Sequence, residues 1–168
     1  KDLAFEFLLF CNRNPKPCPV LEVTEAGSYE PVILAPGSDL RYDIPKYRVY
    51  RNGELEAEVT DIAQYWTDNL VAFLTGCSFG FETALIRAGI PLRHIETDTT
   101  VPMFITNIPT NPAGSFAGPM VVSMRPIKKH QVVRSVQVTS RFPSVHGAPV
   151  HIGRPEEIGI KDINNPDL

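Results

Sequence analysis

The sequence has 168 residues and a formal net charge of −3, with 16 Lys and Arg against 19 Asp and Glu. A chain of this length with 43% apolar residues buries one sizeable core, so we expect a single compact domain. The charges are scattered along the chain, so there is no basic face that would follow a phosphate backbone, and we do not expect nucleic acid as a partner. No apolar run approaches the roughly 20 residues of a membrane-spanning helix, so we expect no membrane span.

The cysteines and the chain ends bear on location. Cys11, Cys18 and Cys77 give an odd count, and no secretory signal opens the sequence. We therefore expect reduced thiols in the cytoplasm, or in the mitochondrial matrix of a eukaryote. Both ends interrupt segments typical of ordered structure, so we expect this chain to be a portion of a longer protein. Prolines and glycines are spread throughout, which predicts short elements with stiff connections and no linker.

The first half of the chain predicts two helices and a hairpin. Residues 2–12, DLAFEFLLFCN, predict a buried helix with Asp2 as its N-cap and apolar side chains on nearly every face. Residues 47–61, YRVYRNGELEAEVTD, predict a β-hairpin around the Asn52-Gly53 turn. Residues 61–76, DIAQYWTDNLVAFLTG, have a helical period and predict a helix that Gly76 ends, with Asp68 as a cap partway along.

The second half alternates helical and extended segments. Residues 78–90, SFGFETALIRAGI, predict a helix with Gly89 just past its C-terminus. MFITN (103–107) and MVVSM (120–124) predict strands joined by a loop. Residues 128–142, KKHQVVRSVQVTSRF, fit either a strand or a helix face, and we favour a helix. Together these elements predict a mixed α/β fold, a mixed sheet with helices, with an α+β arrangement left open.

A faint internal repeat is also visible. AFEFLLFC and VAFLTGCS are similar, and each precedes a segment that begins with Ile-Pro or Val-Pro. A duplicated α/β unit would produce this pattern, but so would a chance similarity of short apolar segments, which we favour.

The segment TGCSFGFE carries the first candidate site. It places Cys77 and Ser78 at a glycine-flanked turn directly before a helix, where free backbone N–H groups and the helix dipole attract an anion and lower a thiol's pKa. The alternative, which the sequence alone favours, makes Cys77 a small buried apolar residue and Ser78 an N-cap.

A second candidate lies in VVSMRP, where Ser123 and Arg125 follow an apolar strand. Ligands often bind at the ends of sheet strands, and a guanidinium can donate two parallel hydrogen bonds to a carboxylate. The alternative for Arg125 is a surface salt bridge.

The third candidate is RFPSVHGAPVHIG, which places Arg141, His146 and His151 on a backbone stiffened by proline and glycine. The two histidines are five residues apart, which does not suit a metal pair on a helix, and no cysteine or acidic residue lies close by, so we expect no metal. One histidine that transfers a proton and one that positions it fit better. Two buried histidines bonded to backbone carbonyls are the other alternative.

Six segments of the chain resemble the D-glutamate cyclase family, whose members often carry the label hydro-lyase. In chain order they are FLLFCNRNPKPCPVLEV, DIPKYRVYRNGE, VAFLTGCSFGFE, VPMFITNIPT, VVSMRP and TSRFPSVHGAPVHIG. The resemblance runs through nearly the whole chain, which is similar to the central part of the family domain. It implies a lyase that closes D-glutamate to 5-oxo-D-proline with loss of water. No cofactor is required for such a reaction, because acid–base catalysis and orientation supply the acceleration.

The implied reaction assigns roles to the candidate residues. Arg125 and Arg141 would bind the two substrate carboxylates, with Ser123 and Asn107 as further binding residues. His146 would take the proton from the amine, and Glu82 or His151 would donate to the departing oxygen. Ser78 and the backbone around Cys77 would hold the developing oxyanion. These roles combine residue chemistry with membership of the motifs.

Two other classes of function remain open. The chain is a non-catalytic binder of small amino or dicarboxylic acids, or a hydratase or dehydratase of another small carboxylic acid. A purely structural role is least favoured, because arginines, histidines and a cysteine at glycine-rich turns have little use in it. In each of the favoured cases the partner is a small carboxylic or amino acid, and a homo-oligomer is left open.

Overall fold

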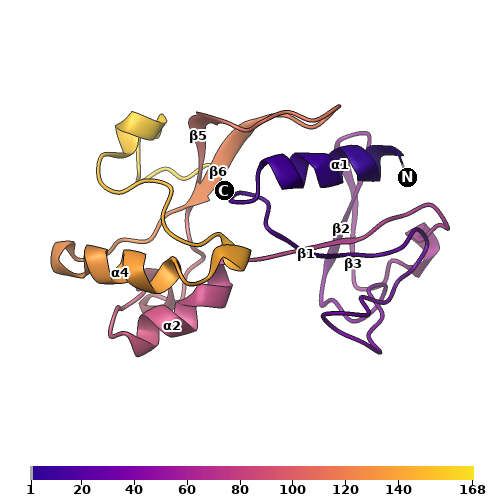
Figure 1. Ribbon diagram of the computed structural model, residues 1–168, viewed down its shortest axis with the longest axis horizontal. Coiled ribbons are helices and arrows are strands. Elements are labelled where there is room, and N and C mark those ends of the chain that lie inside the picture. Colours follow the sequence, from indigo (N-terminus) through magenta and orange to yellow (C-terminus); the bar gives the residue numbers. More distant parts are fainter. Residues whose placement is uncertain (1) are drawn as a thin grey trace. The chain divides into compact units, whose positions relative to one another are not determined.

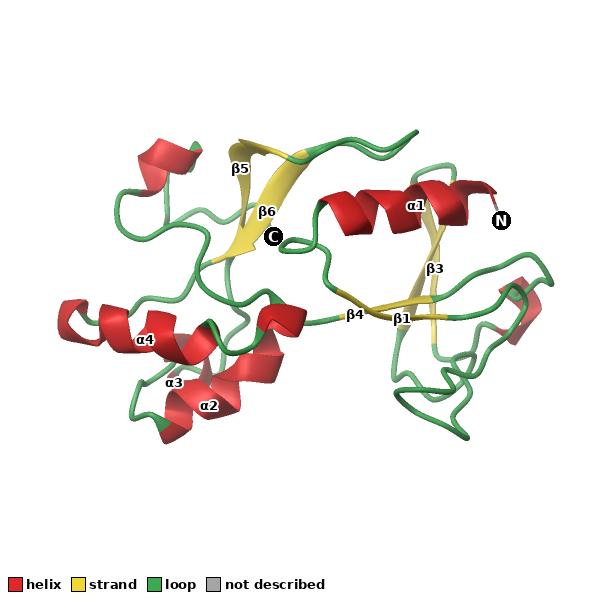
Figure 2. Ribbon diagram, in the orientation of Figure 1, coloured by secondary structure: helices red, strands yellow, loops and turns green. Residues whose placement is uncertain are grey.

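The structure is a computed structural model, and it describes residues 2–168 (Figure 1). Helices are combined with three two-stranded sheets, β1 with β4, β2 with β3 and β5 with β6, which confirms the mixed α/β class (Figure 2). The chain divides into two compact units. The first holds residues 21–74 and the N-terminal residues through Ala4, and the second holds residues 5–20 and 75–168. A single domain stays a prediction of the sequence.

The first helix, α1, spans Asp2–Arg13, as predicted. The side chain of Asp2 lies outside what the structure describes, so the predicted N-cap is not tested. Complete burial of the helix is wrong. Cys11 is buried, whereas the side chains of Leu3 and Phe5 are 62% and 70% exposed. Apolar residues on every face of a sequence segment therefore do not guarantee that every face is covered.

The hairpin is confirmed in the first unit. Strands β2 (Tyr47–Arg51) and β3 (Glu54–Val59) pair antiparallel, and Arg51 lies opposite Glu54. Asn52 and Gly53 have φ angles of 53° and 86°. These two left-handed residues are what a two-residue type I′ turn requires, which is why Asn-Gly predicts the turn so well.

The helix predicted over residues 61–76 is wrong. Only Ala63–Tyr65 form a 3₁₀ turn, η1, and Phe73–Thr75 form strand β4, which pairs with β1 (Val20–Val23). The backbone of this segment bonds to the chain after β1. Thr24 N donates to Ala72 O at 3.0 Å, and Gly27 N donates to Leu70 O at 2.8 Å. Pairing across about 45 residues thus overrides the local helical period.

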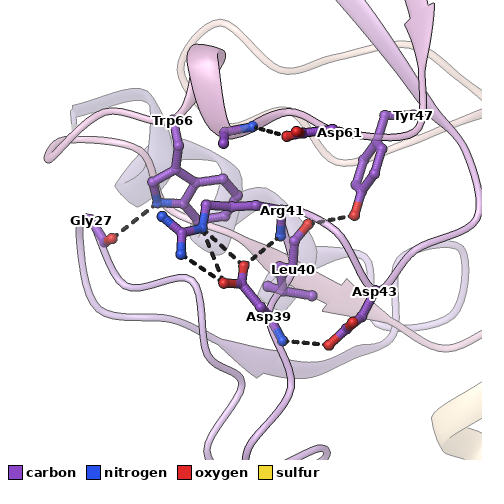
Figure 3. Close-up of polar contacts among 9 residues, drawn as sticks. Gly27, Asp39, Leu40, Arg41, Asp43, Tyr47, Asp61 and Trp66 are labelled. Atoms are coloured by element: carbon purple, nitrogen blue, oxygen red, sulfur yellow. Dashed lines mark hydrogen bonds and ion pairs between the residues drawn. The ribbon is translucent and has the colours of Figure 1, made fainter.

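Side chains fix the long loop between β1 and β2 (Figure 3). The indole N–H of Trp66 donates to the Gly27 carbonyl at 3.0 Å. The guanidinium of Arg41 pairs with the Asp39 carboxylate, with Nη2 2.6 Å from Oδ2. Hydrogen bonds from Arg41 hold the pKa of Asp39 below its ordinary value.

In the second unit, a 3₁₀ turn η2 (Ser78–Phe81) leads into α2 (Glu82–Arg87), and Gly89 follows with φ 77°. This confirms the predicted helix and its left-handed C-terminal glycine. A short helix α3 (Arg93–Glu96) follows. The segment 128–142 is helical as favoured, with η3 (Lys129–Gln131) and α4 (Val132–Thr139).

The predicted strands of the second unit are present as β5 (Met103–Pro109) and β6 (Pro119–Ser123), paired antiparallel. Two further 3₁₀ turns, η4 (Pro143–Val145) and η5 (Pro155–Ile158), follow α4. Helices α2 and α4 pack together (Figure 1). A core of buried apolar residues lies around them, formed by Phe81, Leu85, Ile90, Leu92 and Val138.

The two similar segments of the sequence fold differently. AFEFLLFC lies within α1, whereas VAFLTGCS forms β4 and runs into the first residue of η2. They are therefore not copies of one structural unit.

Within residues 2–168, no helix is both long enough and apolar enough to cross a membrane.

Candidate functional site

A buried ion pair lies at the start of α2 in the second unit. Arg125, just after β6, donates to Oε1 of Glu82, with Nε and Nη2 at 2.9 and 2.6 Å. The same guanidinium donates from Nη1 to the hydroxyl of Ser123 at 2.9 Å and from Nη2 to that of Ser78 at 3.1 Å. Four of its five N–H groups are therefore engaged, and one on Nη1 remains.

The pair is shielded from solvent. The side chains of Arg125 and Glu82 are only 9% and 10% exposed, and the guanidinium carbon lies 5.1 Å from the centre of the Phe81 ring. A surface salt bridge, the alternative for Arg125, is therefore wrong. The sequence singled out Ser78, Glu82, Ser123 and Arg125, and the structure brings the four side chains together, while their roles stay predictions.

The turn before η2 differs from its alternative interpretation. Cys77 is exposed rather than buried, and no side chain caps the start of η2 or of α2. The hydroxyl of Ser78 accepts the bond from Arg125 instead of capping a helix. Burial raises the pKa of the other two thiols, Cys11 and Cys18, which also lie near one another.

His94 is a member of the cluster that the sequence did not reveal. It lies in α3, its side chain is 9% exposed, and its Nε2 is 3.0 Å from Oε1 of Glu82. The angles do not meet those of a hydrogen bond, so Nε2 is a buried nitrogen without a formal partner. The Nε2 atom therefore lies within hydrogen-bonding distance of the carboxylate without being aligned with it. A single histidine in PLRHIE gives no sequence signal for this contact.

His146 is held in an unusual backbone conformation directly after η4. Its φ is 79°, in the left-handed region that residues other than glycine avoid. Its Nδ1 lies 2.9 Å from the carbonyl oxygen of Lys16. A carbonyl only accepts, so Nδ1 carries the hydrogen, and in the neutral ring the lone pair is on Nε2. This is the tautomer of a histidine that accepts a proton through Nε2.

The His146 turn, which comprises η4 and the residues from His146 to Ala148, packs closely on η2, which begins at Ser78. A Cβ atom on Gly76 would lie 1.8 Å from the carbonyl oxygen of Ser144, and one on Gly80 would lie 3.0 Å from Cγ1 of Val145. Gly76 therefore does not end a helix, as the sequence predicted, but lets two backbones approach. This packing brings the His146 turn beside the turn that leads to the buried pair.

Three predicted residues take no part in these contacts. Arg141 is exposed. Nε2 of His151 bonds to the carbonyl of Arg154 at 2.8 Å, close to its own position in the chain. Asn107 is exposed on β5 beside Gly159. In the described part of the chain, no hydrogen bond or ion pair joins Arg141, His151 or Asn107 to the cluster. Their predicted roles stay predictions.

In residues 2–168, no three His, Cys, Asp or Glu side chains are grouped so as to hold a metal ion.

The family model described as D-glutamate cyclase matches residues 71–168, the range that contains every residue of the buried cluster and His146. Relatives named "Putative hydro-lyase" match all 168 residues: 68% identical in Geobacillus kaustophilus, 65% in Bacillus licheniformis and 62% in Stutzerimonas stutzeri. The chain spans 63 to 64% of the length of these relatives. The family resemblance seen in the sequence is confirmed. The chain belongs to the D-glutamate cyclase family.

Proposed function

We propose that the protein is a lyase that closes D-glutamate to 5-oxo-D-proline with loss of water, as part of a longer chain like those of its relatives. The observation that carries the proposal is His146, whose ring is held through Nδ1 so that Nε2 is free to accept a proton. Family membership supports the choice of substrate, and the bond of the His146 ring supports its role as the base.

The reaction places a clear demand on the protein. The substrate begins with an ammonium group and a γ-carboxylate. The new C–N bond forms as one C–O bond breaks, and two protons pass from the nitrogen to the departing oxygen, which leaves as water. No electrons are gained or lost. The protein must therefore accept protons beside the nitrogen, return them beside the oxygen, and hold the chain in a folded conformation.

We assign proton acceptance at the nitrogen to Nε2 of His146. Return to the oxygen falls to the cluster beside it. Glu82 accepts two bonds from Arg125, so it is placed to position its neighbours rather than to donate a proton. His94, 3.0 Å from the same carboxylate oxygen, is the donor we propose in place of Glu82 or His151.

We assign the two anionic parts of the substrate to different groups of the protein, one buried and one exposed. The remaining N–H of Arg125, together with the backbone N–H groups of the Cys77–Ser78 turn, suits the oxygen that gains charge during ring closure. Because most of its donors already serve Glu82 and the two serines, Arg125 has little capacity for a bidentate bond to a carboxylate. Arg141 is exposed and has no such side-chain partner among residues 2–168, so it is better suited to the α-carboxylate of the substrate.

The test uses the protein and, in parallel, the full-length relative from Geobacillus kaustophilus. Each is incubated with D-glutamate or L-glutamate, and 5-oxoproline is followed by proton NMR. We expect product from the D isomer, and a loss of about 10² to 10⁴-fold in the His146→Gln variant. His130→Gln is the matched control, because His130 is exposed outside the cluster.

The contrary outcomes separate the alternatives. Binding of D-glutamate without product in either protein would identify a binder of amino acids. Product from another hydroxy or amino acid in a substrate panel would identify a different dehydratase. Full activity of His146→Gln would refute its role as the base.

A further inference from the structure

We infer that Lys16 is a positioning residue for His146: it fixes the tautomer and the direction of the ring that accepts the proton. The inference deepens the proposed function, on which its kinetic consequence rests. Its structural part concerns only the state of the His146 ring and is tested separately.

Three hydrogen bonds join Lys16 to the His146 turn in both directions. The ammonium Nζ donates to the carbonyl of His146 at 3.1 Å and to that of Ala148 at 2.5 Å. The backbone carbonyl of Lys16 in turn accepts the bond from Nδ1 of His146 at 2.9 Å. One residue thus holds both the backbone of the turn and the ring that the turn carries.

The turn needs such a hold. His146 has φ 79°, and Gly147 follows with φ 69°, so two successive residues are left-handed. A residue with a side chain keeps this conformation only where its surroundings enforce it. The carbonyls of His146 and Ala148 both bind the ammonium of Lys16, and these bonds enforce the conformation. Without the cation, each carbonyl would turn towards water.

Lys16 is itself well anchored. It stands between Pro15 and Pro17 in a turn, which a hydrogen bond from the N–H of Cys18 to the carbonyl of Asn14 closes at 3.0 Å. The buried side chain of Asn14 next to it donates to the carbonyl of Asn111 at 2.8 Å and accepts from the N–H of the same residue at 2.8 Å. The position of the carbonyl that accepts the hydrogen bond from Nδ1 of His146 is therefore set by the fold and not by the histidine.

An ordinary surface lysine would look different. Such a lysine extends into solvent or meets a carboxylate, whereas no carboxylate in residues 2–168 forms an ion pair with Lys16. Its donors serve two backbone carbonyls within one turn, 130 and 132 residues away in the chain.

The experiment compares three variants in the full-length protein. Lys16→Met keeps the aliphatic stem and removes the donors, and Lys16→Arg keeps a cation with donors. Lys161→Met is the control, since Lys161 is exposed and has no side-chain partner among residues 2–168. Nitrogen-15 NMR of the histidine rings, assigned with His146→Gln, reports the tautomer. The pH profile of kcat/KM is measured for the same proteins.

We expect a single Nδ1–H tautomer for His146 in the unmodified protein and in Lys161→Met. In Lys16→Met we expect a mixture of both tautomers, a shifted pH profile and a fall in kcat of about 10²-fold with little change in KM, since a misplaced base slows only the chemical step. Lys16→Arg should recover most of the loss.

Two results would overturn the inference. One is an unchanged tautomer in Lys16→Met. The other is a mixture of tautomers in Lys16→Met with kcat unchanged, which would show that the state of the ring does not affect the reaction. If Lys16→Met does not fold, as judged by circular dichroism, Lys16→Gln, which keeps one donor group, replaces it. If the unmodified protein forms no 5-oxoproline, the proposed function fails, and the ring NMR still decides whether Lys16 holds His146.

Discussion

At the scale of single residues, the ion pair between Glu82 and Arg125 is buried and therefore matters for stability. Both side chains are nearly buried, and the two serine hydroxyls satisfy further N–H groups of the guanidinium. Pairing offsets a desolvation cost that either charge would bear alone. The cluster therefore stays intact only as a whole.

The first prediction concerns this coupling. Glu82→Gln leaves a buried cation without its counter-charge, and we expect the free energy of unfolding to fall by about 3 to 5 kcal/mol. Arg125→Met should cost a similar amount. The double variant should cost clearly less than the sum, because neither uncompensated charge is then present. Urea unfolding measures all three, and additive losses would show that the two charges do not stabilise one another.

At the scale of elements, the site depends on two turns that touch through glycines. The second prediction is that Gly76→Ala displaces the His146 turn, because its Cβ would lie 1.8 Å from the backbone oxygen of Ser144. We expect a loss of at least about 1 to 3 kcal/mol in stability and a change in the ring NMR of His146. Gly80→Ala is the matched comparison, since its Cβ would meet only the side chain of Val145. Equal effects of the two variants would contradict this account.

Elements with strong local signals were predicted correctly from the sequence. The Asn52-Gly53 hairpin, the helix closed by Gly89, and strands β5 and β6 each carry their own turn or cap residues. The 61–76 segment failed because its helical period is local, while its backbone partners lie on the chain after β1. The pattern of residues within one segment carries no information about a hydrogen-bonding partner so far away in the chain.

The same distinction applies to the candidate site. Residue chemistry pointed to Ser78, Glu82, Arg125 and His146, because each lies at a proline- or glycine-rich turn or a strand end. Nothing in the sequence pattern singles out His94 or Lys16, although Lys16 stands between Pro15 and Pro17. Their importance arises only from contacts, and the bonds of Lys16 cross about 130 residues of chain.

At the scale of the whole molecule, we expect acid to lower the stability of the first unit, because the carboxylates of Asp39 and Glu58 form ion pairs. Arg41 holds the pKa of Asp39 below its ordinary value of 3.8, and Lys46 and Arg48 do the same for Glu58. A lowered pKa in the folded state means that the carboxylate contributes stability above its unfolded pKa and loses it as the pH falls through the folded one.

The third prediction is a loss of stability at low pH. The urea midpoint monitored by Trp66 fluorescence should be constant near about pH 5 and should fall progressively below about pH 4. Asp39→Asn should flatten part of this dependence. Added salt should reduce it as well, because the charges are partly exposed. A midpoint that rises on acidification would show that these pairs do not stabilise the fold.

The two compact units lead to the last prediction. Trp66 is the sole tryptophan, and its fluorescence reports on the first unit. Within residues 21–168, the helices α2, α3 and α4 all belong to the second unit, so the helical circular dichroism of that range comes mostly from the second unit. Leu85 is 2% exposed in the core around α2, so Leu85→Ala should destabilise the second unit by about 2 to 5 kcal/mol. If each unit unfolds by itself, the circular dichroism transition moves to lower temperature while the Trp66 transition stays. Coincident shifts would instead show one cooperative domain, as chain length and composition predict.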